Sequence, residues 1–237
     1  MFAGKKVAVM QPYFLPYIGY WQLMNAVDVF VLYDDIQFTK KGWINRNRYL
    51  SSSGPEYFSI PLKKDSDYLD VVERKVSENF KKDKLKIIRK IQASYRKALF
   101  YNEGIELLEK SLSSTNDNLF LFLFDSIVCL KNALGIDTEL AISSELGLSR
   151  DLKGKDRVLS ICERLGASEY INPIGGMDLY DKDFFETHGM TLWFQEVLSE
   201  PYDQQNDLFA PYLSIIDMIM YCGVENTCSK LNEMKLL

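Results

Sequence analysis

The most informative stretch of the sequence is Gln11–Tyr20, which joins a predicted strand to a predicted helix. Pro12 and Pro16 constrain this connection, because proline locks its own φ and holds the preceding residue in an extended conformation. Gly19 lies in the first turn of the helix, where the absence of a Cβ atom lets a ligand or a neighbouring backbone come close. A helix N-terminus that points at the end of a strand favours anions. We therefore predict a substrate-binding loop rather than the alternative, a rigid packed turn. Gln11 has no evident packing role, so we also consider it a catalytic candidate. The other residues proposed to bind substrate in this loop are Pro12, Tyr13, Tyr17, Gly19 and Tyr20.

Two adjacent carboxylates, Asp34 and Asp35, follow the next predicted strand. Neighbouring carboxylates can bind a metal, accept hydrogen bonds from sugar hydroxyls or act as an acid and base pair. Adjacent acids at a strand end are also common in solvated turns. We predict that one of the two carboxylates is a catalytic base or accepts a hydrogen bond from a sugar hydroxyl. We predict no metal site.

The next loop combines cations, an amide and a large aromatic ring. Arginine suits bidentate binding of phosphate or carboxylate, and tryptophan suits stacking on a base or a sugar. The alternative is a polar surface loop with one buried tryptophan. The predicted substrate-binding residues of this loop are Lys41, Trp43, Asn45 and Arg46.

Two further groups of cations stand out. Lys153, Lys155 and Arg157 open a predicted helix, where cations oppose the helix dipole and an anionic ligand would explain them. The eight Lys and Arg residues between Lys81 and Lys97 are more simply a solvated helix face. For this second group, docking to an acidic surface such as a membrane leaflet is the alternative.

The elements that must position these residues alternate between strands and helices. Strands are predicted at 5–10, 28–33, 138–142, 169–172 and 190–197, and helices at 18–26, 153–165 and 181–187. This alternation predicts the α/β class, with a doubly wound, mostly parallel five-stranded sheet. Residues 80–134 predict a helical insertion subdomain, set into a Rossmann-like α/β domain formed by 1–79 and 135–237. We also expect a flanking hairpin from 57–62 and 69–76, and two helices over 211–236 that break at Gly223.

Ligands bind beyond the carboxyl ends of the strands in an open parallel sheet, so the loops that follow the strands should converge there. This adds Ser143, which follows the third strand, to the predicted substrate-binding residues. It also adds Asn172, Gly175 and Gly176, which follow the fourth.

The composition excludes several classes of function. A net charge of −5 argues against a dedicated nucleic-acid binder, so we expect no nucleic-acid partner. No stretch reaches the roughly 18 apolar residues of a membrane span, and residues 1–10 lack the features of a signal peptide. We therefore expect a cytoplasmic protein whose four cysteines are buried free thiols. The single histidine, His188, argues against a Ser-His-Asp or Cys-His catalytic set and fits a helix C-terminus. The 14 tyrosines and 14 phenylalanines permit a homodimer without requiring one.

The opening block resembles the WbqC-like protein family. The family pattern is a Gln-Pro pair, an aromatic residue, a proline, a Gly-Tyr pair, an Asp-Asp pair, and then Gly-Trp and Asn-Arg. Here these are Gln11-Pro12, Tyr13, Pro16, Gly19-Tyr20, Asp34-Asp35, Gly42-Trp43 and Asn45-Arg46, and weaker similarity continues through Gly175-Gly176, Tyr180 and 209–217. The resemblance implies a role in bacterial surface-polysaccharide biosynthesis of the O-antigen (lipopolysaccharide) type, and it leaves the cofactor unknown.

A looser resemblance links the segment to the adenylyl-forming nucleotidyltransferases and pantothenate synthetases. Those enzymes place a His-x-Gly-His motif between the first strand and the first helix. The matching stretch here is Tyr17-Ile18-Gly19-Tyr20, with tyrosines in place of both histidines. A phenol donates a hydrogen bond but carries no positive charge, so this resemblance implies binding of a nucleotide or nucleotide-sugar more than adenylyl transfer.

Three functional hypotheses follow from these patterns. The leading one is a transferase that binds a nucleotide-linked sugar or amino sugar and transfers a small acyl or aminoacyl group to it. The second is a nucleotidyl- or adenylyl-transferring enzyme with an altered motif. The third is a non-catalytic scaffold of a glycan-synthesis complex.

Overall fold

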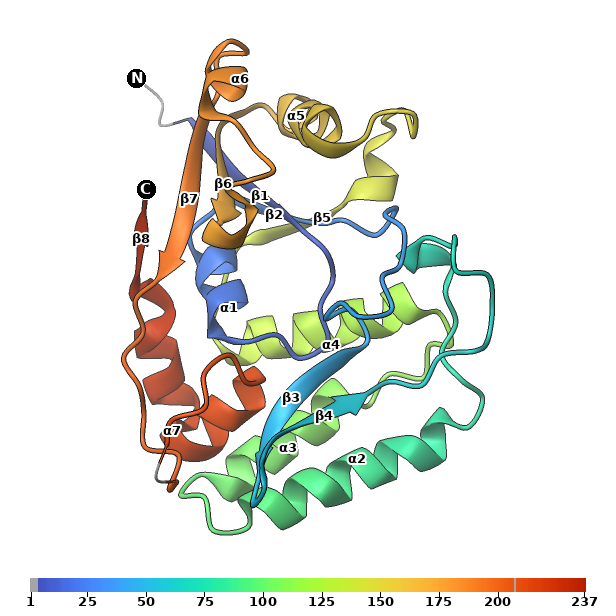
Figure 1. Ribbon diagram of the computed structural model, residues 1–237, viewed down its shortest axis with the longest axis vertical. Coiled ribbons are helices and arrows are strands. Elements are labelled where there is room, and N and C mark those ends of the chain that lie inside the picture. Colours follow the sequence, from blue (N-terminus) through green and yellow to red (C-terminus); the bar gives the residue numbers. More distant parts are fainter. Residues whose placement is uncertain (1–3, 207) are drawn as a thin grey trace.

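The chain forms a six-stranded sheet, and the computed structural model in Figure 1 describes residues 4–206 and 208–237. The strands are β1 (Lys5–Met10), β2 (Val29–Leu32), β5 (Glu139–Ile142), β6 (Ala167–Pro173), β7 (Thr191–Val197) and β8 (Met234–Leu236). They lie in the order β5-β2-β1-β6-β7-β8, and every pair is parallel except β7 with β8. The α/β class and the mostly parallel sheet are therefore confirmed.

The sheet has six strands instead of the five predicted. We expected the chain to be helical up to Leu236, but its last residues form the sixth strand, β8. Helix α7 (Ile215–Ser229) and a short 3-10 helix, η4 (Lys230–Asn232), end before it begins. An ion pair of 2.6 Å between Lys235 and Glu196 joins β8 to β7, and Leu237 and Phe194 exchange backbone hydrogen bonds. Because these partners are distant in the sequence, the local pattern did not reveal the strand.

Strands β1 and β2 are buried on both faces, which explains why each is a continuous apolar run. Val7 and Val9 pack in a cluster with residues of α5 (Gly154–Arg164) and α6 (Lys182–Glu186). Ala8 and Phe30 belong to a second cluster with α1 (Ile18–Asn25). Since side chains alternate between the faces of a strand, the two sets cover opposite sides of the sheet.

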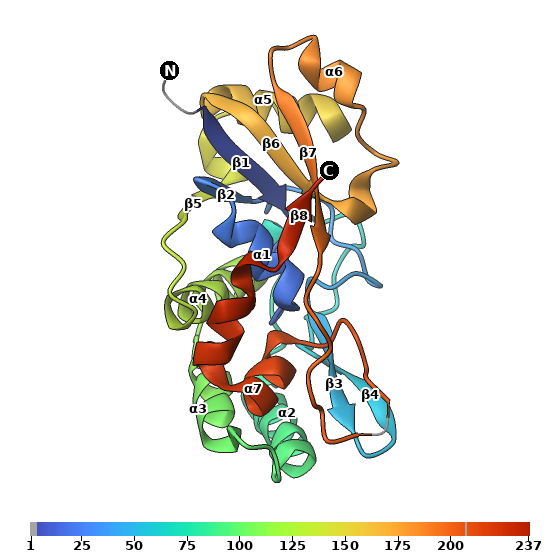
Figure 2. The same ribbon diagram turned by 90° about the vertical axis from the view of Figure 1, so that its left-hand side faces the viewer.

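The side that carries α1 continues into a layer of helices and a hairpin, which fills the lower half of Figure 2. The block predicted to be helical contains α2 (Phe80–Tyr95), α3 (Tyr101–Ser111) and α4 (Leu119–Ala133). Helix α7 packs on α3 so closely that a Cβ atom on Gly104 would lie 2.5 Å from Sδ of Met220. These helices share one hydrophobic cluster with the α1 side of the sheet. A break at Gly223, whose φ is +77°, divides α7 as the sequence predicted.

The hairpin shares only part of one strand with our prediction, because β4 (Gly54–Ser59) overlaps the predicted strand 57–62 but its partner is a different segment. The hairpin pairs β3 (Arg46–Ser51) with β4, and Gly54 adopts the turn conformation, with φ of +107°. The segment 69–76, expected to be a strand, instead contains a 3-10 helix, η1 (Val71–Glu73), flanked by isolated bridges. The sequence of β3 is largely polar and shows no alternation of apolar residues that would predict a strand. It forms a strand because it pairs with β4 across a glycine turn.

The connection between β7 and α7 is tied to the helical layer by a buried carboxylate. Asp217 is 1% exposed and accepts hydrogen bonds from Tyr95 Oη (2.6 Å), Tyr202 Oη (2.5 Å) and Gln204 Nε2 (2.9 Å). Burial raises the pKa of this carboxyl above its ordinary value. The network therefore joins α2, α7 and the connection itself.

The structure also bears on the predictions for His188, the cysteines and membrane spans. His188 follows α6, and its Nδ1 lies 2.8 Å from the carbonyl oxygen of Phe184, as its place after a helix predicted. The four cysteines are free, but only Cys162 is buried, and the other three are partly exposed. Burial raises the pKa of the Cys162 thiol to about 12. Within the described ranges, none of the helices has the length and apolar character needed to cross a bilayer.

Candidate functional site

The sheet reverses its direction of growth between β1 and β6. From β1 the chain adds β2 and then β5 on one side, and it returns to add β6 and β7 on the other. Loops above β1 and β6 therefore diverge, which opens a crevice at the carboxyl ends of the strands, the general ligand position in such sheets. A cleft of about 1140 Å³ lies at this place. Its walls come from the ends of β1, β2, β6 and β7 with the loops that follow them, and from the start of α5.

Half of the predicted site residues line this cleft. They are Gln11, Tyr13, Tyr17, Asp35, Trp43, Asn172, Gly175 and Gly176. The other half do not line it, and they are Pro12, Gly19, Tyr20, Asp34, Lys41, Asn45, Arg46 and Ser143. The predicted loops therefore meet, while many of the residues chosen within them lie behind the cleft surface.

The first wall is the loop that follows β1, and its shape depends on distant partners. Leu15 has a φ of +46°, in the left-handed region that residues other than glycine rarely adopt. The Asn47 amide donates hydrogen bonds to the carbonyl oxygens of Phe14 (2.9 Å) and Leu15 (2.8 Å). Ser214 Oγ donates to the Leu15 carbonyl as well, at 2.8 Å. Asn47 and Ser214, which sequence reasoning missed, thus hold the loop in place.

The N-terminal turn of α1, which we predicted to bind an anion, is buried instead. Tyr20 is in the core, and its hydroxyl donates to the carbonyl oxygen of Gln11 at 3.2 Å. A Cβ atom on Gly19 would lie 2.5 Å from the Tyr17 hydroxyl, so Gly19 makes room for a side chain rather than for a ligand. Tyr17 lines the cleft. Burial, followed by repulsion from Tyr212, raises its pKa to about 12, so it acts as a neutral hydrogen-bonding group.

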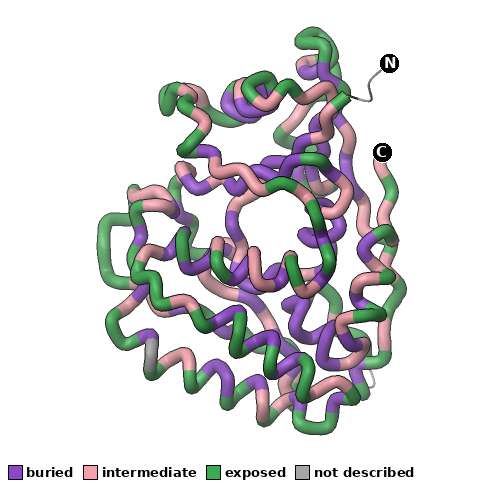
Figure 3. Tube along the Cα trace, turned by 180° about the vertical axis from the view of Figure 1, so that it is seen from behind, coloured by how far each residue is buried: buried purple, intermediate pink, exposed green. Residues whose placement is uncertain are grey.

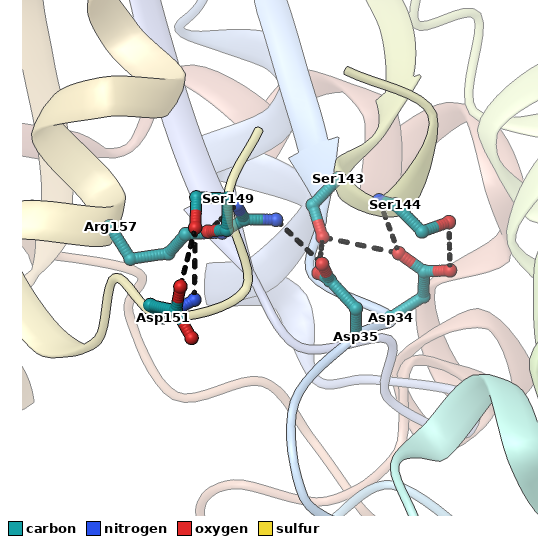
Figure 4. Close-up of polar contacts among 7 residues, drawn as sticks. All are labelled: Asp34, Asp35, Ser143, Ser144, Ser149, Asp151 and Arg157. Atoms are coloured by element: carbon teal, nitrogen blue, oxygen red, sulfur yellow. Dashed lines mark hydrogen bonds and ion pairs between the residues drawn. The ribbon is translucent and has the colours of Figure 1, made fainter. Parts of the chain in front are cut away.

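Asp34 is fully buried, and both of its carboxylate oxygens accept hydrogen bonds (Figure 4). Its Oδ1 accepts from Ser143 Oγ (3.1 Å) and from the Ser144 N–H (3.0 Å), and its Oδ2 accepts from Ser144 Oγ (2.7 Å). The carboxylate joins the end of β2 to a 3-10 helix, η2 (Ser143–Leu146), which follows β5. Asp34 and Ser143 therefore bind each other rather than presenting free groups to the cleft.

Asp35 forms a buried ion pair with Arg157, also visible in Figure 4. The Nη2 to Oδ2 distance is 2.5 Å, and the side chains are 2% exposed for Arg157 and 3% for Asp35. The Ser143 hydroxyl also contacts Asp35, so its single proton is shared between the two carboxylates, and Arg157 Nη1 donates to the Ser149 carbonyl at 2.9 Å. Arg157, which we expected to face an anionic ligand, is thus neutralised internally. It anchors the 149–157 segment that forms one wall of the cleft.

The loop predicted to bind phosphate contributes only Trp43 to the cleft. Arg46 uses its guanidinium on its own loop, donating to the carbonyl oxygens of Gly42 (3.1 Å) and Lys41 (2.5 Å). Lys41 is exposed outside the cleft. The Asn45 amide donates to the backbone carbonyl of Ile60, just after β4, at 2.9 Å. The side chains of Arg46 and Asn45 therefore shape the loop that carries the tryptophan.

Strand β6 runs into a 3-10 helix, η3 (Ile174–Gly176), which forms another wall. The Asn172 side chain accepts from Tyr170 Oη (3.0 Å) and donates to the Pro173 carbonyl (3.0 Å). A Cβ atom on Gly176 would lie 2.0 Å from Asn172 Nδ2, so glycine is required for this amide to occupy its place. Gly175 has open space where its side chain would be, which leaves its backbone accessible from the cleft.

Two cations line the cleft at the start of α5. Arg150, which was not predicted, and Lys153, which was expected to face an anion, are both exposed side chains. Neither forms an ion pair with any residue that the structure describes. Lys155 does not line the cleft, and its Nζ lies 4.1 Å from the centre of the Phe184 ring. Arg150 could have been predicted from its position, because it lies in the loop between β5 and α5, at the edge of the sheet where ligands bind.

Two carboxylates of the cleft were also missed. Asp70 is partly buried beside η1, and burial, followed by repulsion from Glu73, raises the pKa of its carboxyl. Glu196, at the end of β7, is paired with Lys235 on β8. No local motif marks either residue, because the fold alone brings them to the cleft. Across 4–206 and 208–237, no three His, Cys, Asp or Glu side chains gather in a way that could hold a metal ion.

The sequence was also compared with known proteins. Residues 11–228 match the model of the WbqC-like protein family, a span that includes the loops around the cleft. The chain is also similar to the uncharacterized protein Rv1507c of Mycobacterium tuberculosis, with 29% identity over 224 residues that cover 93% of this chain and 95% of that protein. No solved structure matches. The family match covers most of the chain and confirms the resemblance drawn from its opening motif, so the protein belongs to the WbqC-like family.

Proposed function

We propose that this protein binds a nucleotide-linked amino sugar in the cleft between β1 and β6 and transfers a small acyl or aminoacyl group to it. The observation that carries the proposal is the cleft, which combines aromatic rings, unpaired cations and a carboxylate at the point where the sheet reverses. Small-molecule sites commonly have volumes of roughly 300–1000 Å³, so this space suits an extended ligand of several parts. We place the reaction in bacterial surface-polysaccharide biosynthesis, as the family resemblance implies, and in the cytoplasm.

The diphosphate of the ligand is assigned to the start of α5. The N-cap residue, Lys153, makes no side-chain cap, so the first N–H groups of the helix need other partners. Phosphate oxygens are favourable partners for such groups. Arg150 and Lys153 add positive charge at the same edge of the cleft, and a guanidinium can contact two phosphate oxygens at once.

The nucleobase is assigned to the aromatic side of the cleft. Trp43, Tyr17 and Tyr212 line that side, and the Tyr17 and Tyr212 ring centres lie 5.8 Å apart, edge to face. Aromatic side chains stack on bases of any sequence. Gln11 and the Gly175 backbone supply neutral hydrogen-bonding groups for the sugar between the two ends.

The transfer step is assigned to Asp70. We predicted that Asp34 or Asp35 is the general base, but their carboxylates bind serines and Arg157. Asp70 lines the cleft and lies outside this group of contacts, so we assign the role of base to it instead. The sugar amine attacks the acyl carbon of a thioester donor, the thiolate leaves, and Asp70 accepts the proton that the nitrogen loses. A pKa raised by burial makes Asp70 a stronger base than a solvated aspartate.

Binding is tested with thermal melting and calorimetry on a panel of nucleotide-linked sugars, free nucleotides and free sugars. We expect stabilisation by a nucleotide-linked sugar and at least tenfold weaker binding to Lys153→Gln, since a charge-assisted contact contributes about 1.5–3 kcal/mol. Lys155→Gln is the matched control, because Lys155 lies on the same helical turn but outside the cleft. A panel that leaves the melting temperature unchanged would overturn the proposal.

Transfer is tested by mass spectrometry of a nucleotide-linked amino sugar incubated with acyl thioesters. Asp70→Asn should abolish the acylated product while leaving the affinity for the sugar within a few fold. Asp65→Asn removes an exposed carboxylate from the same loop and should leave turnover unchanged. Product formation that survives Asp70→Asn would refute the assigned role of this carboxylate.

The placement of Tyr20 weighs against the nucleotidyl-transfer alternative. Of the two tyrosines at the positions of the motif histidines, only Tyr17 lines the cleft, while Tyr20 is 1% exposed. A pair of groups that stabilise one transferring phosphate must both reach it. Release of pyrophosphate from a nucleoside triphosphate would reinstate this alternative.

A further inference from the structure

The exposed side of α2 is strongly cationic although the chain as a whole carries a net charge of −5. Its side chains recur every three or four residues, which places them along one side of the helix. The exposed cations of α2 and the residues just after it are Lys82, Lys86, Arg89, Lys90, Arg96 and Lys97. The opposite side, with Ile87, Ile88 and Ile91, is buried against the helical layer. Figure 3 shows this alternation along the helix at the lower edge of the molecule.

Little within the molecule neutralises these cations. Lys86 pairs with Asp83 at 2.8 Å, three residues before it. For the other five cations, no ion pair forms with the residues that the structure describes. A row of like charges repels itself, so the face gains free energy from any extended anionic surface that meets it.

Two further features of this face point to lipid. Leu85 is 51% exposed among the cations, and Leu99, two residues beyond Lys97, is 77% exposed. At the C-terminal end of α2 a polar pocket of about 380 Å³ opens against the turn of the hairpin. Serine hydroxyls and cations line it together, namely those of Ser52, Ser94, Arg96 and Lys97. Ser51 lines it as well, but its hydroxyl donates to the Gly54 carbonyl. Hydroxyls beside cations form a suitable environment for a phosphate group.

We propose that the α2 face docks this protein on an anionic phospholipid leaflet, with the pocket at its end receiving a headgroup phosphate. A straight helix of 16 residues, about 24 Å long, presents its cations in a row that suits a plane. Exposed leucines enter the interfacial region of a bilayer, whereas a nucleic-acid surface offers them no partner. Among the residues of the α2 face whose burial the structure describes, no aromatic ring is exposed, so the face lacks the stacking groups that single-stranded nucleic acids prefer.

The arrangement of the molecule is compatible with docking and ligand binding at the same time. In Figure 1, α2 lies along the edge farthest from α5 and α6, whereas the diphosphate end of the cleft lies at the start of α5. The docking surface and the cleft share no lining residue. Failure of one proposal therefore leaves the other standing.

The test is co-sedimentation of the full chain with vesicles of phosphatidylglycerol and phosphatidylcholine in equal parts, beside vesicles of phosphatidylcholine alone. We expect binding to the anionic vesicles only, weakening as salt is added. Each cation near an anionic leaflet contributes about fivefold in partitioning, so the triple variant Lys82→Gln, Lys90→Gln, Lys97→Gln should bind roughly a hundredfold more weakly. Leu85→Gln should weaken binding further, by several fold. These side chains are exposed, so thermal melting should be unchanged.

The matched control removes the same charge elsewhere, through Lys64→Gln, Lys131→Gln and Arg164→Gln. It should bind anionic vesicles within a few fold of the wild type. Equal losses in the two triple variants would show that net charge, not the α2 face, governs binding and would overturn the proposal. So would wild-type protein that ignores anionic vesicles, or a single-stranded RNA that binds the α2 face more tightly than the vesicles do. Excess glycerol phosphate that displaces the protein from vesicles would point to a free phosphate ester instead of a leaflet.

Discussion

The buried pair between Asp35 and Arg157 yields a quantitative prediction for the substitution Arg157→Met. Methionine replaces the length of the side chain without its charge, so packing is largely kept. What is lost is the 2.5 Å ion pair and the 2.9 Å hydrogen bond to the Ser149 carbonyl. With both side chains no more than 3% exposed, water cannot replace either contact.

The expected loss of stability follows from this burial. Removing one partner of a buried pair typically costs about 3–5 kcal/mol, because the remaining charge is left without a counterion. For a chain of this size each kcal/mol lowers the melting temperature by about 2–4 °C, so the variant should melt roughly 6–20 °C lower. The matched control is Arg164→Met on the same helix, where the side chain is exposed and the effect should stay within about 0.5 kcal/mol.

Urea unfolding of the single and double variants isolates the pair itself. Asp35→Asn combined with Arg157→Met removes both charges, so its cost should fall well below the sum of the single costs. We expect a coupling energy of about 2 kcal/mol or more between the two positions. Single costs that add within about 0.5 kcal/mol would show that the two groups act independently, and the reasoning from burial would then be wrong.

Three further predictions concern groups behind the cleft and in the helical layer. Asp217 has a pKa raised above 3.8 by burial, so its contribution to stability is fully present below pH 3.8 and is lost as the pH rises through the raised value. The unfolding free energy of the wild type minus that of Asp217→Asn, from urea titrations, should therefore decrease with pH across that window, and a constant difference would contradict it. Gly19→Ala places a Cβ atom against Tyr17, so it should cost about 1–3 kcal/mol and weaken ligand binding; unchanged melting and affinity would refute the packing role. Asn47→Ala leaves the Phe14 carbonyl without its donor and the Leu15 carbonyl with Ser214 alone, so it should cost about 1–3 kcal/mol in urea unfolding. A loss well below about 1 kcal/mol would mean that water replaces the amide.

The central strands and the place of the cleft could be predicted because they depend on short-range patterns. The continuous apolar runs at β1 and β2 indicate strands buried on both faces, and the rule for open parallel sheets then locates the ligand edge. Gln11, Tyr17 and Gly175 reach the cleft for that reason. For Gly19 we expected a ligand or a neighbouring backbone to come close, whereas the group that lies there is the side chain of Tyr17.

The partners of charged and polar side chains could not be predicted, because they depend on which distant segments meet. Arg46 has the composition of a phosphate ligand, yet the turn before β3 supplies carbonyl oxygens within its reach. Asp34 meets serines from the end of β5, more than a hundred residues away. Asp70 reaches the cleft through a segment that was expected to be a strand. In each case long-range pairing decides the role that residue type leaves open.

The left-handed conformation of Leu15 has a consequence for how the molecule is made. The donors that hold it come from Asn47 and from Ser214, the latter 199 positions further along the chain. A nascent polypeptide that has left the ribosome as far as β7 already contains five strands of the sheet, but it still lacks one of the two groups that hold this loop. The set of donors that holds Leu15 is therefore complete only once the start of α7 has been synthesised.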